Sequence, residues 1–249
     1  MTSTKTPTLV AHRGWPARYP ENTLEGFAAA VRVGARWLEC DVQLSADGVP
    51  FVSHDVSLKR TAGIDRDITD MSAAELGIVS VGERTRFGVR YADIKLPSLA
   101  ALITWLSTQP GVTLFVEIKR QSLRHHGVEL VVGKILHALQ PAFEQCIVIS
   151  FDHACLALAR QHGASAIGWA VEAANDDSRH IADTLQPDYM FTDEKLFIAM
   201  HAALLGRWQW IAYHTEDAER ALELAHQGAA FIETNDIGAM LKSPQFASA

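Results

Sequence analysis

The sequence predicts an α/β protein, a (β/α)8 TIM barrel with a small inserted subdomain. A length of 249 residues suits one such domain, spanning 1–249. Eight apolar runs of strand length recur along the chain, and amphipathic stretches of helix length separate them. A doubly wound open sheet is the alternative for the same alternation.

The apolar and amphipathic patterns place these elements in order. Strands are predicted at 8–12, 36–42, 112–118, 146–151, 166–171, 188–192, 208–213 and 229–233. Helices are predicted near 23–34, 98–108, 127–139, 153–162, 177–185, 195–205 and 217–227. At the first helix, Asn22 and Glu25 match a capping box, which predicts Asn22 as the N-cap, and Gly34 ends the helix.

One further apolar run, 49–55, interrupts the alternation. It follows the second strand after only a short turn, whereas parallel neighbours need a connection of roughly a dozen residues. We therefore expect an antiparallel return strand that turns at Asp47-Gly48. That geometry brings His54 beside Asp41 at the end of the second strand.

Residues 56–96 fit no strand–helix unit. They are polar, contain four glycines and hold one short capped helix at Ser72–Leu76. We expect an insertion over the C-terminal mouth of the barrel, where barrel enzymes keep their sites. Two interpretations stay open, a cap that helps to enclose a substrate and a plain surface loop.

Composition and charge narrow the class of protein. No apolar run approaches the roughly 18 residues of a membrane span, so no stable membrane association is expected. A net charge of −7 argues against nucleic acid as a partner, so any positive field for an anionic ligand must be local. The polar start, 1–7, predicts no signal peptide. The cysteines lack metal-ligand spacing and predict reduced thiols in a cytoplasmic protein: Cys40, Cys146 and Cys155.

Acidic residues gather at the C-terminal ends of two predicted strands. Residues two apart on a strand share a face, so Glu39 lies with Asp41, and Glu117 lies with Lys119. Three converging carboxylates repel one another unless a proton or a cation offsets the repulsion. Oxygen-only ligands favour a hard ion, Mg²⁺ or Ca²⁺. The alternative is a set of strand-end ion pairs, such as Glu117 with Lys119.

Histidines and cations flank these carboxylates. His12 ends the first strand and His54 ends the return strand, so the two can serve as general acid and general base. His214, after the seventh strand, is a further candidate. Arg13 can clamp an anionic oxygen and Lys119 can add a point charge. The whole set suits acid–base chemistry at an anionic centre, and a phosphodiester fits best.

Several short motifs follow one another in a recognisable order. They are His12-Arg13-Gly14, Pro20-Glu21-Asn22-Thr23, Glu39-Cys40-Asp41-Val42, Asp47-Gly48-Val49-Pro50, His54-Asp55, Leu96-Pro97-Ser98-Leu99, Glu117-Ile118-Lys119 and Ser150-Phe151. Their order and approximate spacing across 8–151 resemble those of the glycerophosphodiester phosphodiesterases. The first motif alone is a weak signal, and the specificity comes from the full series.

The resemblance implies a TIM barrel with a subdomain inserted after the second histidine. It also implies one divalent cation, Mg²⁺ or Ca²⁺, and hydrolysis of a small-molecule glycerophosphodiester to sn-glycerol 3-phosphate and an alcohol. The residues that it carries over are the acid–base pair His12 and His54, the metal ligands Glu39, Asp41 and Glu117, the phosphate contacts Arg13 and Lys119, and the supporting Glu21 and Asn22. Glu21 is the better functional candidate of the last two, because helix capping already explains Asn22.

The C-terminal third departs from the family pattern. Tyr213-His214-Thr215-Glu216 stands where the family often has Trp-Thr-Val-Asn, and Thr234-Asn235-Asp236-Ile237 stands where it usually has Thr-Asp-Arg-Pro. These loops face the barrel mouth, so the changes bear on the preference for the leaving alcohol.

Two other functions stay open. A lysophospholipase D acting on lysophospholipids needs an apolar groove, towards which the insertion offers little beyond Phe87 and Tyr91. A catalytically silent binding module usually shows the loss of a histidine or a metal carboxylate, and here all five are present.

Overall fold

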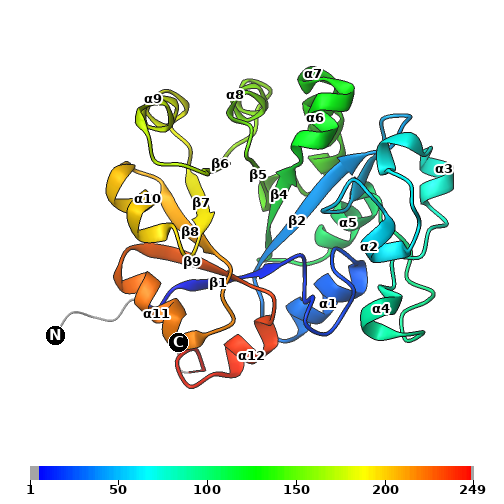
Figure 1. The fold of residues 1–249 in the computed structure, drawn as a ribbon, viewed down its shortest axis with the longest axis horizontal. Coiled ribbons are helices and arrows are strands. Elements are labelled where there is room, and N and C mark those ends of the chain that lie inside the picture. Colours follow the sequence, from blue (N-terminus) through cyan, green and yellow to red (C-terminus); the bar gives the residue numbers. More distant parts are fainter. Residues whose placement is uncertain (1–5, 248–249) are drawn as a thin grey trace.

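Eight parallel strands close into a barrel in the computed structural model, which describes residues 6–247 (Figure 1). The strands are β1 Thr8–His12, β2 Trp37–Leu44, β4 Thr113–Ile118, β5 Cys146–Ser150, β6 Ile167–Ala170, β7 Tyr189–Asp193, β8 Gln209–Tyr213 and β9 Ala229–Thr234. Strand β1 pairs in parallel with both β2 and β9, which closes the ring. The predicted TIM barrel is therefore confirmed, and the open sheet is excluded.

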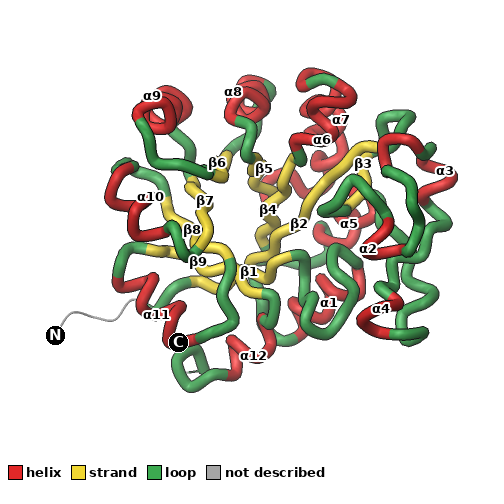
Figure 2. Tube along the Cα trace, viewed as in Figure 1, coloured by secondary structure: helices red, strands yellow, loops and turns green. Residues whose placement is uncertain are grey.

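Helices surround the strands on the outside of the barrel (Figure 2). The seven predicted helices are present as α1 Leu24–Arg32, α5 Leu99–Leu106, α7 Val128–Leu139, α8 His153–Gln161, α9 Asp176–Leu185, α10 Phe197–Ala203 and α11 Ala218–His226. Further helical segments that the sequence did not predict are α6 Arg120–His126, the 3-10 segment η2 Gln140–Gln145 and α12 Ile237–Lys242.

Alternation along each strand divides its side chains between two cores. In β2, Leu38 packs outward with the apolar faces of the helices, whereas Trp37 points into the barrel. There it packs against three other aromatic side chains, Phe115, Tyr189 and Phe231. The distances from its ring centroid to theirs are 4.8 to 6.4 Å. This aromatic layer fills the barrel below its C-terminal end, so inward-facing residues further along each strand reach the mouth.

The short return strand after β2 is confirmed. Strand β3 Pro50–Val52 runs antiparallel to β2, with Val52 opposite Val42. Gly48 has a φ of +77°, the left-handed conformation that a tight turn of this kind favours in glycine.

Helix α1 is capped by Thr23, and the prediction that Asn22 is its N-cap is wrong. The Thr23 hydroxyl accepts a hydrogen bond from the Gly26 N–H at 3.2 Å, and Thr23 has the extended backbone of an N-cap. Asn22 instead has a φ of +55°. Because an N-cap requires β-region backbone, that left-handed conformation leaves the side chain of Asn22 free for another partner.

The insertion forms a small cluster beside the barrel, to the right of β2 in Figure 1. It contains α2 Lys59–Ala62, the 3-10 turn η1 Ile68–Asp70, α3 Ala73–Leu76 and α4 Arg84–Phe87. The predicted capping box at Ser72 is present, since the Ser72 hydroxyl accepts from the Glu75 N–H and the Glu75 carboxylate accepts from the Ser72 N–H. Apolar side chains such as Leu58, Ile68 and Leu76 give the insertion its own core.

The structure bears only in part on the predictions about membrane association and cellular compartment. A helix able to span a membrane is absent from residues 6–247. The three cysteines are buried and form no disulfide with one another. The prediction about a signal peptide rests on 1–7, of which 1–5 lie outside the described residues.

Candidate active site

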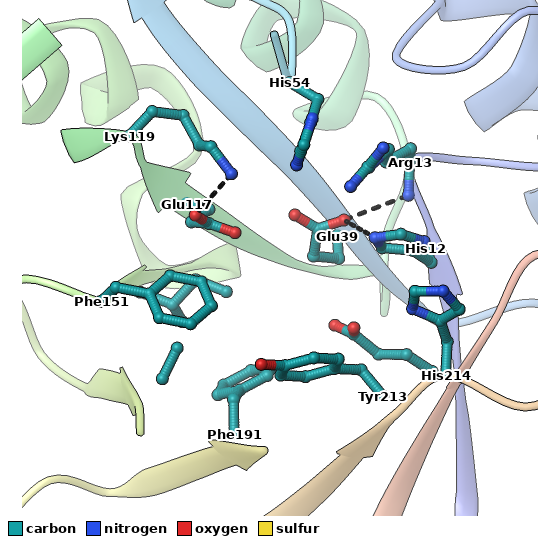
Figure 3. A pocket seen from close by; sticks show the side chains of 13 residues that line it. His12, Arg13, Glu39, His54, Glu117, Lys119, Phe151, Phe191, Tyr213 and His214 are labelled. Atoms are coloured by element: carbon teal, nitrogen blue, oxygen red, sulfur yellow. Dashed lines mark hydrogen bonds and ion pairs between the residues drawn. The ribbon is translucent and has the colours of Figure 1, made fainter. Parts of the chain in front are cut away.

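A cavity of about 230 Å³ opens at the C-terminal end of the barrel. Figure 3 shows the side chains of Lys119, His54, Arg13 and His12 directed toward Glu39 and Glu117. On the opposite side lie Phe151, Phe191 and Tyr213. The cavity therefore has one charged side and one largely apolar side.

The three predicted carboxylates meet because β2 and β4 pair in parallel register. Asp41 lies opposite Glu117 across that pair, and Glu39 precedes Asp41 on the same inward face. One oxygen from each of the three lies within 4.8 Å of the others. Burial, together with the other carboxylates, raises the pKa of Glu39 well above its usual range and that of Glu117 to about 7.

Both cations predicted for this site also pair with the carboxylates. Lys119 Nζ lies 2.8 Å from Glu117 Oε1 and 3.2 Å from Asp41 Oδ1. Arg13 Nε lies 3.0 Å from Asp41 Oδ2. Burial opposes the ionised form of Asp41, but these two cations hold the pKa of its carboxyl below the usual range. The ion pairs that were the alternative to a metal site at these strand ends are therefore present in the structure.

These ion pairs do not satisfy the whole cluster. Glu39 is 2% exposed, and its Oε1 has no hydrogen-bond partner among the described residues. Glu39 Oε2 accepts only the backbone N–H of Arg13, at 3.1 Å. Carboxylate oxygens are the ligands that hard divalent cations prefer, so the free oxygen and the three clustered carboxylates fit such an ion.

The two predicted acid–base histidines occupy different surroundings. His12 Nδ1 lies 2.8 Å from Asn235 Oδ1, and its Nε2 lies 3.8 Å from Glu39 Oε2. Burial and the nearby charge of Arg13 lower the pKa of His12 to about 3. His54 Nδ1 lies 2.7 Å from Asp55 Oδ1, and burial lowers its pKa while Asp41 opposes the change. His54 thus lies within hydrogen-bond distance of a carboxylate, whereas the nearest carboxylate oxygen to His12 is at 3.8 Å.

Asn22 and Glu21, predicted as supporting residues, contact different charged groups of the site. Asn22 Nδ2 donates to Asp41 Oδ2 at 2.9 Å, and its Oδ1 accepts from the Asp41 N–H at 3.3 Å. Glu21 accepts two hydrogen bonds from Arg60, at 2.7 and 2.8 Å, and lies 3.3 Å from Arg13 Nη1. The reason for ranking Asn22 below Glu21 is therefore wrong, because Asn22 directly holds a carboxylate of the cluster.

The insertion contacts the site through Arg60 and Glu83, and the Glu83 carboxylate accepts from the Glu21 N–H at 2.7 Å. Arg60 in α2 bonds Glu21 and also donates to Asp55 Oδ2 at 2.7 Å, and Asp55 in turn contacts His54. None of the described residues 56–96 lines the cavity itself. In this structure the insertion braces two loops of the site from outside.

Two residues of the site were missed as functional candidates. Glu233 in β9 lines the cavity, is 3% exposed and has an Oε1 without a partner. Burial and the Glu117 carboxylate raise its pKa to about 8. Its place two residues after Phe231 in a buried strand was the available signal. Asn235 was noted only as a departure from the family pattern, and no local pattern showed its contact with His12.

His214, the further candidate, lies over the first histidine. Its ring stacks on that of His12 with centroids 4.8 Å apart and planes 19° apart. Both line the cavity. The structure therefore gives His214 a contact with His12.

Known proteins match this chain in sequence and in fold. A sequence model described as the glycerophosphoryl diester phosphodiesterase family matches residues 12–196. Glycerophosphodiester phosphodiesterases of Bacillus altitudinis and Caldanaerobacter subterraneus are each 31% identical, over 151 and 147 residues. These matches cover 60% and 58% of this chain and the same shares of the relatives, so the chain spans about 60% of their length.

Solved structures match over nearly the whole chain. A phosphodiesterase of Oleispira antarctica, in complex with the product sn-glycerol-3-phosphate, has a TM-score of 0.81 at 26% identity. The match covers 94% of this chain and 95% of that one. A glycerophosphodiester phosphodiesterase of Thermotoga maritima has a TM-score of 0.74 at 22% identity and covers 95% and 97%, which shows a shared fold.

Proposed function

Because the chain belongs to the glycerophosphoryl diester phosphodiesterase family, we propose that it hydrolyses glycerophosphodiesters to sn-glycerol 3-phosphate and an alcohol. The observation that carries this proposal is the single cavity in which two histidines, two cations and a carboxylate cluster meet. The product bound to the Oleispira antarctica phosphodiesterase supports it.

We propose one catalytic domain over 1–249, with 56–96 as an inserted subdomain that braces the site. Its partner is a small-molecule diester, since the cavity of about 230 Å³ suits a compact substrate. The free, buried thiols support a reducing compartment such as the cytoplasm.

Arg13 and Lys119 are proposed to bind the phosphate. Both line the cavity and both are largely buried, so their charges are screened less than surface charges. Glu39, Asp41 and Glu117 would hold one divalent cation, Mg²⁺ or Ca²⁺. When bound, such an ion stabilises negative charge that develops on the phosphate oxygens.

The histidines are proposed to move the two protons of the reaction. Burial keeps His12 neutral, so we assign to it the removal of a proton from the nucleophile. The nucleophile is a water molecule or the adjacent 2-hydroxyl of the substrate. His54, whose Nδ1 contacts the Asp55 carboxylate, is assigned the protonation of the leaving alcohol.

The test is a panel of substrates with release of glycerol 3-phosphate as the readout. Glycerophosphocholine, glycerophosphoethanolamine and glycerophosphoglycerol should each yield it, with Mg²⁺ or Ca²⁺ present. We expect His12→Ala and His54→Ala each to lower kcat by roughly 100-fold or more. His153→Ala, at an exposed position of α8, is the control and should leave kcat unchanged.

The same panel separates the alternatives. EDTA should abolish activity and added Mg²⁺ or Ca²⁺ should restore it, whereas full activity after exhaustive chelation would rule out the metal role. Near-normal turnover in either histidine variant would sink the acid–base assignment. Turnover of a lysophospholipid alone would favour the lysophospholipase D alternative, and turnover of none would favour a binding module.

A further inference from the structure

We propose that Asn235 and Glu216 are positioning residues that hold His12 in one tautomer, with the ring proton on Nδ1 and the lone pair on Nε2. The proposal deepens the proposed function, since it rests on an acid–base role for His12. The two segments that depart from the family pattern, around Glu216 and Asn235, would then act together to position His12.

Two hydrogen bonds link Glu216 to Asn235 and Asn235 to His12, and Glu216 sets the direction of both. Asn235 Nδ2 lies 2.7 Å from Glu216 Oε1, and the Asn235 backbone N–H donates to the same oxygen at 3.4 Å. An ionised carboxylate only accepts hydrogen bonds. The amide NH₂ of Asn235 must therefore face Glu216, which turns the amide oxygen toward His12.

The amide oxygen then determines the state of the imidazole. Asn235 Oδ1 lies 2.8 Å from His12 Nδ1, and an amide oxygen can only accept. His12 Nδ1 must carry the proton, so a neutral ring leaves Nε2 unprotonated. Nε2 is the nitrogen that lies 3.8 Å from Glu39 Oε2, at the carboxylate cluster. The lone pair thus faces the groups that are proposed to carry the reaction.

Packing holds the ring in this orientation. His12 is 7% exposed, and the His214 ring stacks on it with centroids 4.8 Å apart. The contributing residues come from three adjacent strands, since His12 ends β1, Asn235 follows β9 and Glu216 follows β8. His54 is held differently, by the neighbouring Asp55 in the chain. The C-terminal loops therefore hold His12, whereas Arg60 of the insertion holds Asp55, the partner of His54.

The first test reads the tautomer directly, in the full-length protein labelled with ¹⁵N at histidine. The His12 signals, assigned by their loss in His12→Gln, should show a proton on Nδ1 and none on Nε2. In Asn235→Ala, the Nε2–H form should become populated. The same variant should lose about 10- to 100-fold in kcat, with KM within about twofold.

A double variant separates positioning from a merely structural role. Asn235→Asp alone sets two carboxylates against each other, and it should lower kcat. Adding Glu216→Gln supplies an amide NH₂ that donates to the new carboxylate, which still accepts from His12 Nδ1. The pair should recover kcat to within a few-fold of the unaltered protein. Glu219→Gln, exposed on α11, is the control for a charge change in the same region.

The outcomes are separable from those of the proposed function. A proton on His12 Nε2 in the unaltered protein would overturn the inference, and so would an unchanged tautomer in Asn235→Ala. A double variant no better than Asn235→Asp alone would also contradict it. The Nδ1–H tautomer in a protein inactive on every glycerophosphodiester would uphold the positioning and reject the function.

Discussion

Two adjacent residues at the start of α1, Asn22 and Thr23, have separate roles. Thr23 satisfies the Gly26 N–H and caps the helix. Asn22 bonds both the carboxylate and the backbone of Asp41. At the residue scale, the left-handed backbone of Asn22, with φ of +55°, is what separates the two.

These roles predict that one substitution impairs the site and that its neighbour impairs only the stability of the fold. Asn22→Gly removes the contact with Asp41 without opposing the positive φ, so cation affinity or kcat should fall roughly 10- to 100-fold. Thr23→Ala removes the cap and should lower the free energy of unfolding by about 1 kcal/mol, with kcat nearly unchanged. Calorimetric titration with Mg²⁺ and Ca²⁺, steady-state kinetics and thermal unfolding measure the contrast. Equal effects on catalysis from both substitutions would contradict it.

At the scale of elements, the insertion contacts the site through α2 and through Glu83, which precedes α4 and accepts from the Glu21 N–H. Arg60 joins Glu21, before α1, to Asp55, after β3. The loop that carries His54 is therefore tied to the loop that carries Arg13, although neither belongs to the insertion. This geometry makes α2 a brace between two segments that supply charged groups to the cavity.

Arg60→Met should therefore weaken catalysis from outside the cavity. Loss of the guanidinium frees Asp55 and Glu21 together, and we expect kcat to fall about tenfold, in line with supporting contacts elsewhere. Arg66→Met removes an exposed ion pair with Glu75 within the same insertion and is the matched control. Steady-state kinetics at saturating substrate compares the two. If both variants keep full activity, α2 does not brace the site.

At the scale of the whole molecule, charge is unevenly distributed. The chain carries a net charge of −7, yet its barrel holds three buried carboxylates, Glu39, Asp41 and Glu233, and a fourth, Glu117, that is partly exposed. Arg13 and Lys119 are the two cations that line the same cavity. Without a bound cation, ionisation of Glu39, Glu117 and Glu233 opposes folding, because like charges are held together in a medium of low polarity.

The stability of the metal-free protein should consequently fall as the pH rises above about 7. Burial raises the pKa of Glu117 to about 7 and that of Glu233 to about 8, against an ordinary 4.5. Below about pH 7 the lowered pKa of His12, ordinarily 6.5, acts in the opposite direction, because the unfolded state then holds a proton on that ring that the folded state lacks. Between about pH 7 and 8 the carboxyls set the sign: the folded state binds more protons than the unfolded state, so raising the pH destabilises the fold. Thermal unfolding in EDTA from pH 7 to 8.5 measures the slope.

Two controls accompany the pH series. Mg²⁺ or Ca²⁺ should restore the Tm most at the alkaline end, because a ligand of the folded state stabilises it. Glu233→Gln should flatten the slope, since it removes one of the carboxyls with a raised pKa. A Tm that rises between pH 7 and 8.5 in EDTA would show that the cluster does not oppose folding.

Much of the fold could be predicted because its signals are local. Every barrel strand lies within two residues of its predicted bounds, as apolar runs between polar segments are hard to misplace. Segments α6 Arg120–His126 and α12 Ile237–Lys242 were missed, since both are short and the first is mostly polar. The insertion gave only Ser72–Leu76, because its other turns lack a capping box or a sustained period.

The sequence by itself determined the barrel and the central set of candidate residues. Residues two apart on a strand share a face, and parallel strands end at one rim, so Glu39, Asp41 and Glu117 had to converge. Only the tertiary structure decided which residues hydrogen-bond to the functional side chains. His12 meets Asn235 across 223 residues and Glu21 meets Arg60 across 39, and contacts at such separations leave no periodic trace in a sequence.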